Sequence, residues 1–129
     1  MRKTATLALG VWLAGGTLVA QEPTIKSLRS QDLAGAPGKE LVMITVEYPP
    51  GGSDPVHRHH AQAMVFVLEG SVVMQVRGQD PITLVSGETF YEGPDDVHLV
   101  ARNASQSAPA KFLVFFVKDK GTAIKIPAK

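Results

Sequence analysis

Short apolar runs rich in Val, Ile, Phe and Thr occupy most of the chain after residue 40. Turn-forming stretches that contain Gly, Pro, Asp and Ser separate these runs at close intervals, as they separate consecutive β-strands. The pattern predicts eight strands, at residues 41–48, 56–60, 63–68, 72–76, 82–85, 89–91, 97–102 and 112–117.

About eight antiparallel strands in roughly 90 residues must close or stack, because a flat sheet would leave an apolar face and two edges in water. The expected fold is therefore all-β, a small jelly-roll (double-stranded β-helix) barrel of about eight antiparallel strands in residues 41–129. Residues 21–40 are polar and contain Gly35, Pro37 and Gly38. They predict a peripheral N-terminal lead-in segment with a short edge strand at residues 25–28.

The N-terminus has the three parts of a secretory signal: a basic start at Arg2 and Lys3, an apolar stretch at residues 4–20, and a small residue, Ala20, before a polar segment. This pattern predicts a signal peptide at residues 1–20, cleaved before Gln21, and a periplasmic or secreted protein. The alternative is an uncleaved anchor, since about 17 apolar residues lie near the lower limit for a membrane span. No other stretch predicts a membrane span, so no membrane contact is expected after cleavage.

Charge and cysteine content exclude several classes of function. The chain has 13 basic and 12 acidic residues, and losing Arg2 and Lys3 would leave a mature charge of about −1 with no basic stripe. Nucleic acid is therefore not an expected partner. The absence of cysteine removes disulfides and thiolate metal ligands, which leaves imidazole and carboxylate groups for any metal.

Three of the four histidines form the candidate site. Side chains alternate across a strand, so His57 and His59 project to one face while His60 faces the other way. His98 lies in another predicted strand, and if the two strands are neighbours the three imidazoles can meet at metal-binding range. The alternative is a solvated histidine turn and an unrelated core histidine at His98.

Two segments carry a resemblance to a known family. The stretch 51–70, with His57 and His59, resembles the first motif of the cupin superfamily, and the stretch 87–98, which ends at His98, resembles the second. The resemblance covers residues 41–117. It implies a six- to eight-stranded jelly-roll barrel that holds one divalent metal, with iron(II), manganese, zinc and nickel as candidates, in its mouth. His57, His59 and His98 are then the expected ligands.

The chain departs from the family pattern at two places. The family's glutamate ligand falls on Ala63, and its neighbour Gln62 reaches the metal only if the strand contains a bulge. Glu69 is expected at the rim. In the second motif the family's glycine is replaced by Asp95 and its proline by Gly93, so the turn before His98 departs from the family pattern.

Three neutral ligands leave the metal's full charge uncompensated, which favours anionic small molecules. Three-histidine sites of this kind are similar to those of thiol and diketone dioxygenases. The sequence leaves two functions open. The first is an enzyme, either a mononuclear metal oxygenase or a related isomerase or lyase. The second is a non-catalytic module with a degenerate site that binds a metal or a small ligand. The sequence identifies no catalytic residue, and a homodimer is compatible with it.

Two further side chains are candidates for the pocket. Phe90 and Tyr91 are adjacent, so one of them must face the interior, and Tyr91 is either a pocket hydroxyl or a wall residue. Arg102 has the same strand parity as His98 and is expected either to meet a substrate carboxylate or to lie beyond the rim. The stretch Asn103-Ala104-Ser105 also matches a glycosylation acceptor, a pattern short enough to arise by chance.

Overall fold

The structure, a computed structural model, describes Gly16 and residues 21–129. Apart from Gly16, the predicted signal peptide at residues 1–20 lies outside these ranges. The described part of the chain contains no helix, so it offers none that could cross a membrane. Its strands are β1 (Thr24–Asp32), β2 (Lys39–Tyr48), β3 (His57–Arg58), β4 (Ala61–Glu69), β5 (Ser71–Val76), β6 (Ile82–Val85), β7 (Thr89–Glu92), β8 (Val97–Asn103), β9 (Ala110–Asp119) and β10 (Ile126–Pro127).

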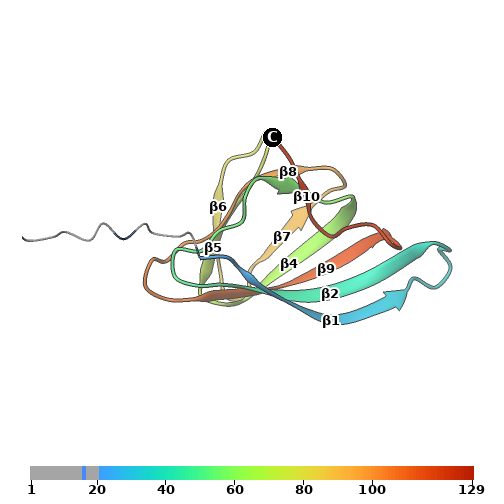
Figure 1. The fold of residues 1–129 in the computed structure, drawn as a ribbon, viewed down its shortest axis with the longest axis horizontal. Coiled ribbons are helices and arrows are strands. Elements are labelled where there is room, and N and C mark those ends of the chain that lie inside the picture. Colours follow the sequence, from blue (N-terminus) through green and yellow to red (C-terminus); the bar gives the residue numbers. More distant parts are fainter. Residues whose placement is uncertain (1–15, 17–20) are drawn as a thin grey trace, which may run out of the picture.

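The ten strands form two antiparallel five-stranded sheets, in the orders β1-β2-β9-β4-β7 and β10-β3-β8-β5-β6. Figure 1 shows β2, β9 and β4 side by side as one wall, with β5, β6 and β8 on the other. The prediction of an all-β jelly roll is confirmed. Each of the eight predicted strands is present, and β1 and β10 add one strand at either end.

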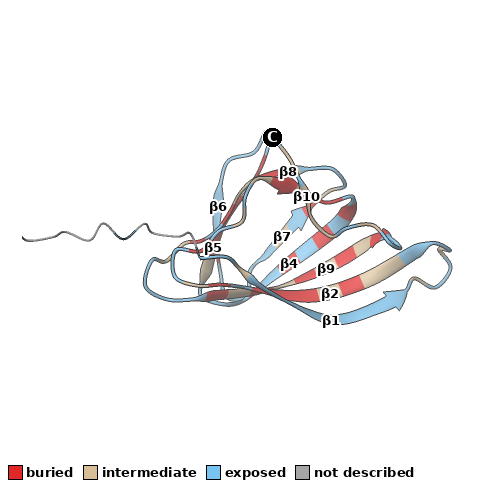
Figure 2. Ribbon diagram, viewed as in Figure 1, coloured by how far each residue is buried: buried red, intermediate tan, exposed pale blue. Residues whose placement is uncertain are grey.

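The core lies between the two sheets and comes from alternate positions on each strand. In β4 the buried residues are every second one from Ala61 to Val67, and in β9 Phe112, Val114 and Phe116 alternate with more exposed neighbours. Figure 2 shows this alternation as red and paler bands along β4 and β9. Burying a side chain such as Phe116 contributes about 1.5–3 kcal/mol relative to leaving it in water.

The lead-in segment forms a longer strand than the four residues expected. β1 pairs with β2 from Thr24 opposite Glu47 to Asp32 opposite Glu40, and all nine of its residues are exposed. Its polar side chains gave little strand signal because an edge strand is held by backbone hydrogen bonds to one neighbour and needs no apolar face.

Part of the outer surface of the first sheet is apolar. Met64 and Tyr91 are cross-strand neighbours on β4 and β7, and both are more than half exposed. Phe66, two residues along β4 from Met64, is 42% exposed. These three side chains form an apolar patch on the outside of the barrel, away from the core.

Candidate metal centre

His57 and His98 face each other across two paired strands. In the antiparallel ladder of β3 and β8, His57 is the direct partner of His98. Directly opposite residues place their side chains on the same face of a sheet. Accordingly, the two imidazole rings have centroids 5.0 Å apart, and both side chains are buried.

His59 completes a group of three. It lies just beyond the two-residue strand β3, and its ring centroid is 4.9 Å from that of His57. One ligand atom from each of the three histidines can be chosen so that all lie within 4.8 Å of one another. Because a metal–imidazole bond is about 2.0–2.1 Å long, an ion between them would need side-chain shifts of less than about 1 Å.

The protein backbone fixes the orientation of two of the rings. His57 donates from Nδ1 to the carbonyl of Pro55 over 2.8 Å, and His59 donates from Nδ1 to the carbonyl of Ile124. In both rings the lone pair is then on Nε2. Metal-binding histidines in proteins are commonly held in this way by a hydrogen bond from the other nitrogen.

Glu92 brings a carboxylate to the histidines, and the sequence analysis missed it. It ends β7 and is buried, with Oε1 in contact with His98 Nδ1 and Oε2 3.4 Å from His59 Nε2. The strand parity of β7 could have revealed it, since Phe90 faces inward and Glu92 follows two residues later. The site is therefore not purely neutral, and the inference that the metal's full charge is uncompensated is wrong.

Electrostatics favour the metal-binding forms of these side chains. Burial, together with the nearby His98 and His59, lowers the pKa of His57 despite the opposing effect of the Pro55 carbonyl. Burial pushes the pKa of Glu92 upward, but the hydrogen bond from His98 and the surrounding histidines outweigh it and hold that pKa below its usual value. Near neutral pH the site thus presents a neutral His57 imidazole beside a Glu92 carboxylate.

One buried nitrogen shows that the group fits a metal ion. His98 Nε2 has no contact with solvent and no hydrogen-bond partner within the described residues. A buried polar atom without a partner costs free energy, so such atoms are rare unless a ligand or water satisfies them. Three imidazoles and one carboxylate are also a donor set that zinc, iron, manganese and nickel accept.

His60 lies outside this group, as strand parity predicts. Its side chain is 45% exposed and contacts the carboxylate of Asp95 through Nδ1. Asp95 adopts a left-handed backbone with φ of 64°, the conformation that a glycine at this motif position would adopt readily, and its N–H donates to the carbonyl of His59. Asp tolerates this conformation better than most residues, so the turn is preserved without the glycine.

None of the other predicted pocket residues lines the histidine cavity, although Ala63 lies next to it. Ala63 is fully buried on the inward face of β4, directly opposite Glu92. Gln62 is exposed and lines a separate hollow, because β4 pairs regularly with β9 at this point and has no bulge there. Tyr91 is 54% exposed and faces outward.

Arg102 is exposed, and the expectation that it shares the inward face of His98 is wrong. Val76 pairs with His98 and Gln75 pairs with Val100, so Leu99 is an extra residue that shifts the alternation of β8. Ala101 and Asn103 face inward as a result. The Asn103 amide donates to three backbone carbonyls, which leaves it inaccessible to glycosylation in the folded protein.

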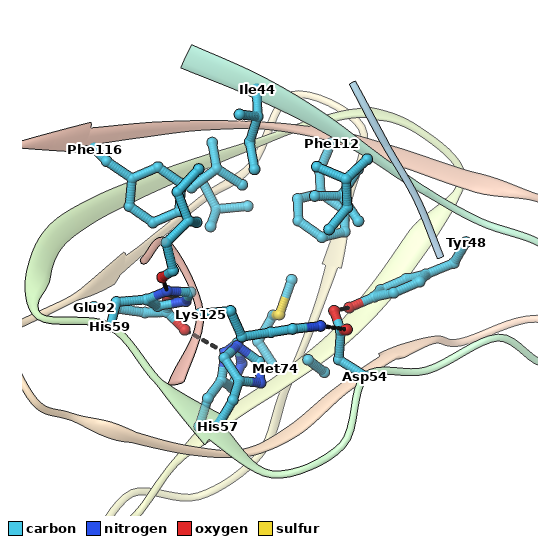
Figure 3. Close-up of a pocket in the computed structure, with 17 residues that line it drawn as sticks. Ile44, Tyr48, Asp54, His57, His59, Met74, Glu92, Phe112, Phe116 and Lys125 are labelled. Atoms are coloured by element: carbon cyan, nitrogen blue, oxygen red, sulfur yellow. Dashed lines mark hydrogen bonds and ion pairs between the residues drawn. The ribbon is translucent and has the colours of Figure 1, made fainter. Parts of the chain in front are cut away.

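The three histidines and Glu92 line one wall of a small cavity of about 50 Å³. Figure 3 shows His59 and Glu92 on one side and Tyr48 with Asp54 on the other. Most of the remaining lining residues are apolar, among them Ile44, Val65, Met74, Phe112, Val114 and Phe116. The volume corresponds to about four water molecules, so any ligand enclosed beside a metal ion would be small.

These features define a class of protein: a small jelly-roll barrel with a buried three-histidine, one-carboxylate site on a cavity lined by core residues. The family model described as "Cupin domain" matches residues 44–116, which is more than half of the chain. The chain therefore belongs to the cupin family.

Solved structures share the fold at low sequence identity. The DMSP lyase DddQ from Ruegeria pomeroyi is 24% identical with a TM-score of 0.64, over 81% of this chain and 50% of that one. An oxalate oxidase in complex with the substrate analogue glycolate is 24% identical with a TM-score of 0.63, over 86% and 58%. A conserved Klebsiella pneumoniae protein with a double-stranded β-helix domain is 19% identical with a TM-score of 0.64, over 82% and 86%.

This chain thus spans about half the length of the DMSP lyase that it resembles. No curated protein sequence matches it.

Proposed function

We propose that this chain is a metal-dependent cupin enzyme that acts on a small anionic molecule. In this proposal His57, His59 and His98 bind one divalent metal, and Glu92 supplies a negative charge beside it. The observation that carries the proposal is the convergence of three buried imidazoles, one of which has a buried nitrogen without a partner among the described residues.

The residues of the chain would each have a defined task. The carbonyls of Pro55 and Ile124 hold the rings of His57 and His59, and Glu92 contacts both His98 and His59. The apolar wall around them excludes bulk water, which strengthens electrostatic interactions inside the cavity. A divalent metal held there would supply Lewis acidity toward an oxygen of the substrate, as in a metal-dependent oxygenase, isomerase or lyase.

Charge and size support a small anion as the ligand. A divalent ion with one carboxylate retains a net charge of about +1, which an anionic ligand would neutralise. A cavity of about 50 Å³ suits a molecule of few heavy atoms. Glycolate, the substrate analogue bound to the similar oxalate oxidase, is an acid of this size.

A non-catalytic binding module is the second candidate, and the position of Glu92 favours it. Three histidines and a carboxylate can fill all four positions around a zinc ion, and structural sites are closed in this way whereas catalytic sites keep a position open. Cobalt(II) substitution separates the two functions, because its visible absorption is intense for four ligands and weak for five or six. We expect the weak spectrum of an open site, and an intense spectrum unchanged by added acids would indicate a closed site.

Metal analysis of the protein purified without added metal tests the site directly. We expect about one divalent ion per chain, and its identity chooses among iron, manganese, zinc and nickel. Metal-free protein that also fails to take up any of these ions would contradict the proposed function.

Export and self-association complete the proposal. The signal-like N-terminus supports a periplasmic or secreted protein that begins at Gln21. Mass spectrometry of the exported form tests this, since retention of residues 1–20 would indicate an anchor. The exposed patch of Met64, Phe66 and Tyr91 supports a homodimer, which light scattering would detect.

A further inference from the structure

The cavity beside the histidines has a second polar end. Tyr48 donates its hydroxyl to Asp54 Oδ2 over 2.7 Å, and the Lys125 ammonium donates to Asp54 Oδ1 over 2.6 Å. All three side chains line the same cavity as His57, His59 and His98. Figure 3 shows the ammonium end of Lys125 beside Asp54 and Tyr48, across the cavity from Glu92.

Lys125 has hydrogen-bonding capacity left over at this end. Both oxygens of Asp54 are already used, and the Tyr48 hydroxyl is turned toward Asp54. The ammonium group has three donors, and Asp54 is its one acceptor within the described residues. Two donors are therefore not used by the described residues, and they can bond to solvent or to a ligand in the cavity.

We propose that Lys125 recognises the carboxylate of the substrate and makes the site specific for short carboxylic acids. This inference rests on the proposed function. An acid whose hydroxyl or carbonyl oxygen lies at the metal would direct its carboxylate toward the opposite, Lys125 end of the cavity. The ammonium can donate to the acid and to its amide, but only the ionised acid adds the attraction between opposite charges, so the acid would bind more tightly than its amide.

The surroundings of Lys125 differ from those of the other lysine–aspartate pairs. In the pairs Lys39–Asp119 and Lys120–Asp32 all four side chains are about half exposed or more, as is usual for surface ion pairs of little energetic value. In the pair with Lys125, Asp54 is only 9% exposed and Lys125 is 36% exposed. The Lys125 pair lies at the wall of a cavity, where a charge acts on a ligand with less screening.

The backbone holds Lys125 in a fixed position relative to the histidines. The carbonyl of the preceding residue, Ile124, accepts the hydrogen bond from His59. The strand β10 begins directly after Lys125 and pairs with β3, with Pro127 opposite His57. The same short C-terminal segment therefore orients a candidate metal ligand and carries the cation that would hold the other end of the substrate.

Isothermal titration of zinc-loaded protein with two acids and their neutral amides tests the inference. The pairs are glycolate with glycolamide and 3-hydroxypropanoate with 3-hydroxypropanamide, and zinc affinity is measured separately for each variant. We expect Lys125→Met to weaken binding of at least one acid by about 10- to 100-fold, to weaken binding of its amide much less, and to leave zinc affinity unchanged. Lys125→Arg should restore most of the loss.

Two further variants distinguish recognition from a structural role. Asp54→Asn removes the carboxylate that competes for the ammonium group, so it should strengthen binding of the acid, whereas a purely structural ion pair would make it as harmful as Lys125→Met. Lys120→Met is the matched control, because it removes a lysine–aspartate pair of similar length outside the cavity. It should leave the affinities for zinc, acids and amides unchanged.

Three results would overturn the inference. The first is that Lys125→Met loses equal affinity for acids and for amides. The second is that Asp54→Asn loses as much acid binding as Lys125→Met does. The third is that zinc-loaded wild-type protein binds neither acid. A wild-type protein that takes up no zinc, iron, manganese or nickel overturns the proposed function itself and this inference with it. Zinc affinity and acid affinity are measured separately, so the two failures are distinguishable.

Discussion

Ala63 on β4 and Glu92 on β7 lie directly opposite each other, and both side chains are buried on the inward face of the sheet. Cross-strand partners of this kind have Cβ atoms about 4.5–5.5 Å apart. The carboxylate of this site thus comes from the strand next to the one on which the cupin pattern places it. It reaches the histidines from β7 while β4 contributes a methyl group.

Replacing Glu92 with Gln should weaken metal binding. The substitution keeps the shape but removes the charge and places amide hydrogens beside His98 and His59. We expect the zinc dissociation constant to rise by about 10- to 100-fold, the usual effect of losing a carboxylate that supports a histidine ligand. Glu69→Gln, at the exposed end of β4, is the matched control. Equal zinc affinity in the two variants would show that Glu92 has no part in the site.

Alanine substitutions of His59 and His60 should differ in their effect on zinc affinity. His59→Ala removes a ligand and should reduce zinc affinity by more than the roughly 10- to 100-fold cost of losing a supporting group. His60→Ala removes an exposed ring whose one hydrogen bond among the described residues is to Asp95, so zinc affinity should be unchanged. Competition with a chromophoric chelator measures both. Comparable loss in both variants would contradict the assignment of ligands.

The sequence predicted the strands well because nearly all of them bury one face, so their apolar residues alternate visibly. It missed most of β1, whose nine residues are all exposed and whose pairing depends on the backbone. Alternation placed His57 and His59 on one face, and it persists around them even though β3 is only two residues long. His98 was joined to them through the resemblance to the two cupin motifs, and the pairing of β3 with β8 places it opposite His57.

Sequence reasoning was less successful where the backbone departs from regular geometry. The extra residue Leu99 in β8 turns Arg102 outward, and no composition signal marks such a bulge. Asp95 keeps the left-handed turn through its own conformation and through its N–H bond to His59. The motif gives no sign of Glu92, because the family's glutamate position falls on Ala63 of β4 whereas Glu92 ends β7.

The left-handed backbone at Asp95 predicts that a glycine at this position is tolerated better than a valine. A residue with a bulky side chain is strained at a φ of 64°, by roughly 1–2 kcal/mol. Asp95→Val should therefore lower the urea midpoint of unfolding clearly, whereas Asp95→Gly should have little effect. Asp96→Val in the same turn is not a neutral control because the Asp96 carboxylate accepts from the Gly93 N–H, so Glu69→Val serves instead. If Gly and Val are equally destabilising at residue 95, side-chain contacts rather than backbone strain determine the choice of Asp.

Lowering the pH should reduce the stability of the fold, in part because Glu40 becomes protonated. The hydrogen bond from Lys118, then that from Ser30, lowers the pKa of Glu40, with burial opposing. A carboxyl group with a lowered folded-state pKa stabilises the fold above its unfolded pKa of about 4.5, and this contribution disappears as the pH falls through the folded-state value. Glu40→Gln should therefore lower the urea midpoint at pH 7 and make little difference once the pH is below the folded-state pKa. A pH-independent difference between the two proteins would show that the charge of Glu40 is not the cause.

Ala63→Glu alone should create a conflict with Glu92. Two carboxylates about 5 Å apart repel by on the order of 3 kcal/mol at an effective dielectric constant of about 20, and the larger side chain must also enter a fully buried position. The metal-free variant should therefore unfold at a lower temperature than the wild-type protein. Zinc should restore much of this loss because the ion attracts both carboxylates.

The double variant Ala63→Glu/Glu92→Ala moves the carboxylate from β7 to β4. It tests whether the site needs the carboxylate on β7 or accepts it on either strand. Because the residues are cross-strand partners, the exchange moves the negative charge by about one strand spacing of 4.7–4.9 Å and conserves the total side-chain volume. Glu92→Ala alone should bind zinc weakly. The carboxylate introduced at position 63 also faces inward and should recover most of the affinity, since charge near the cation matters more than which strand supplies it.

Zinc titration of the wild-type protein, Glu92→Ala and the double variant decides the outcome, with thermal unfolding to verify that each is folded. Glu92 contacts both His98 and His59, so it could act by orienting these rings as well as by its charge. A carboxylate at position 63 replaces the negative charge but does not orient the two rings. A folded double variant that binds zinc no better than Glu92→Ala would therefore show that the contacts of Glu92 with the two histidines, and not its charge alone, build the site.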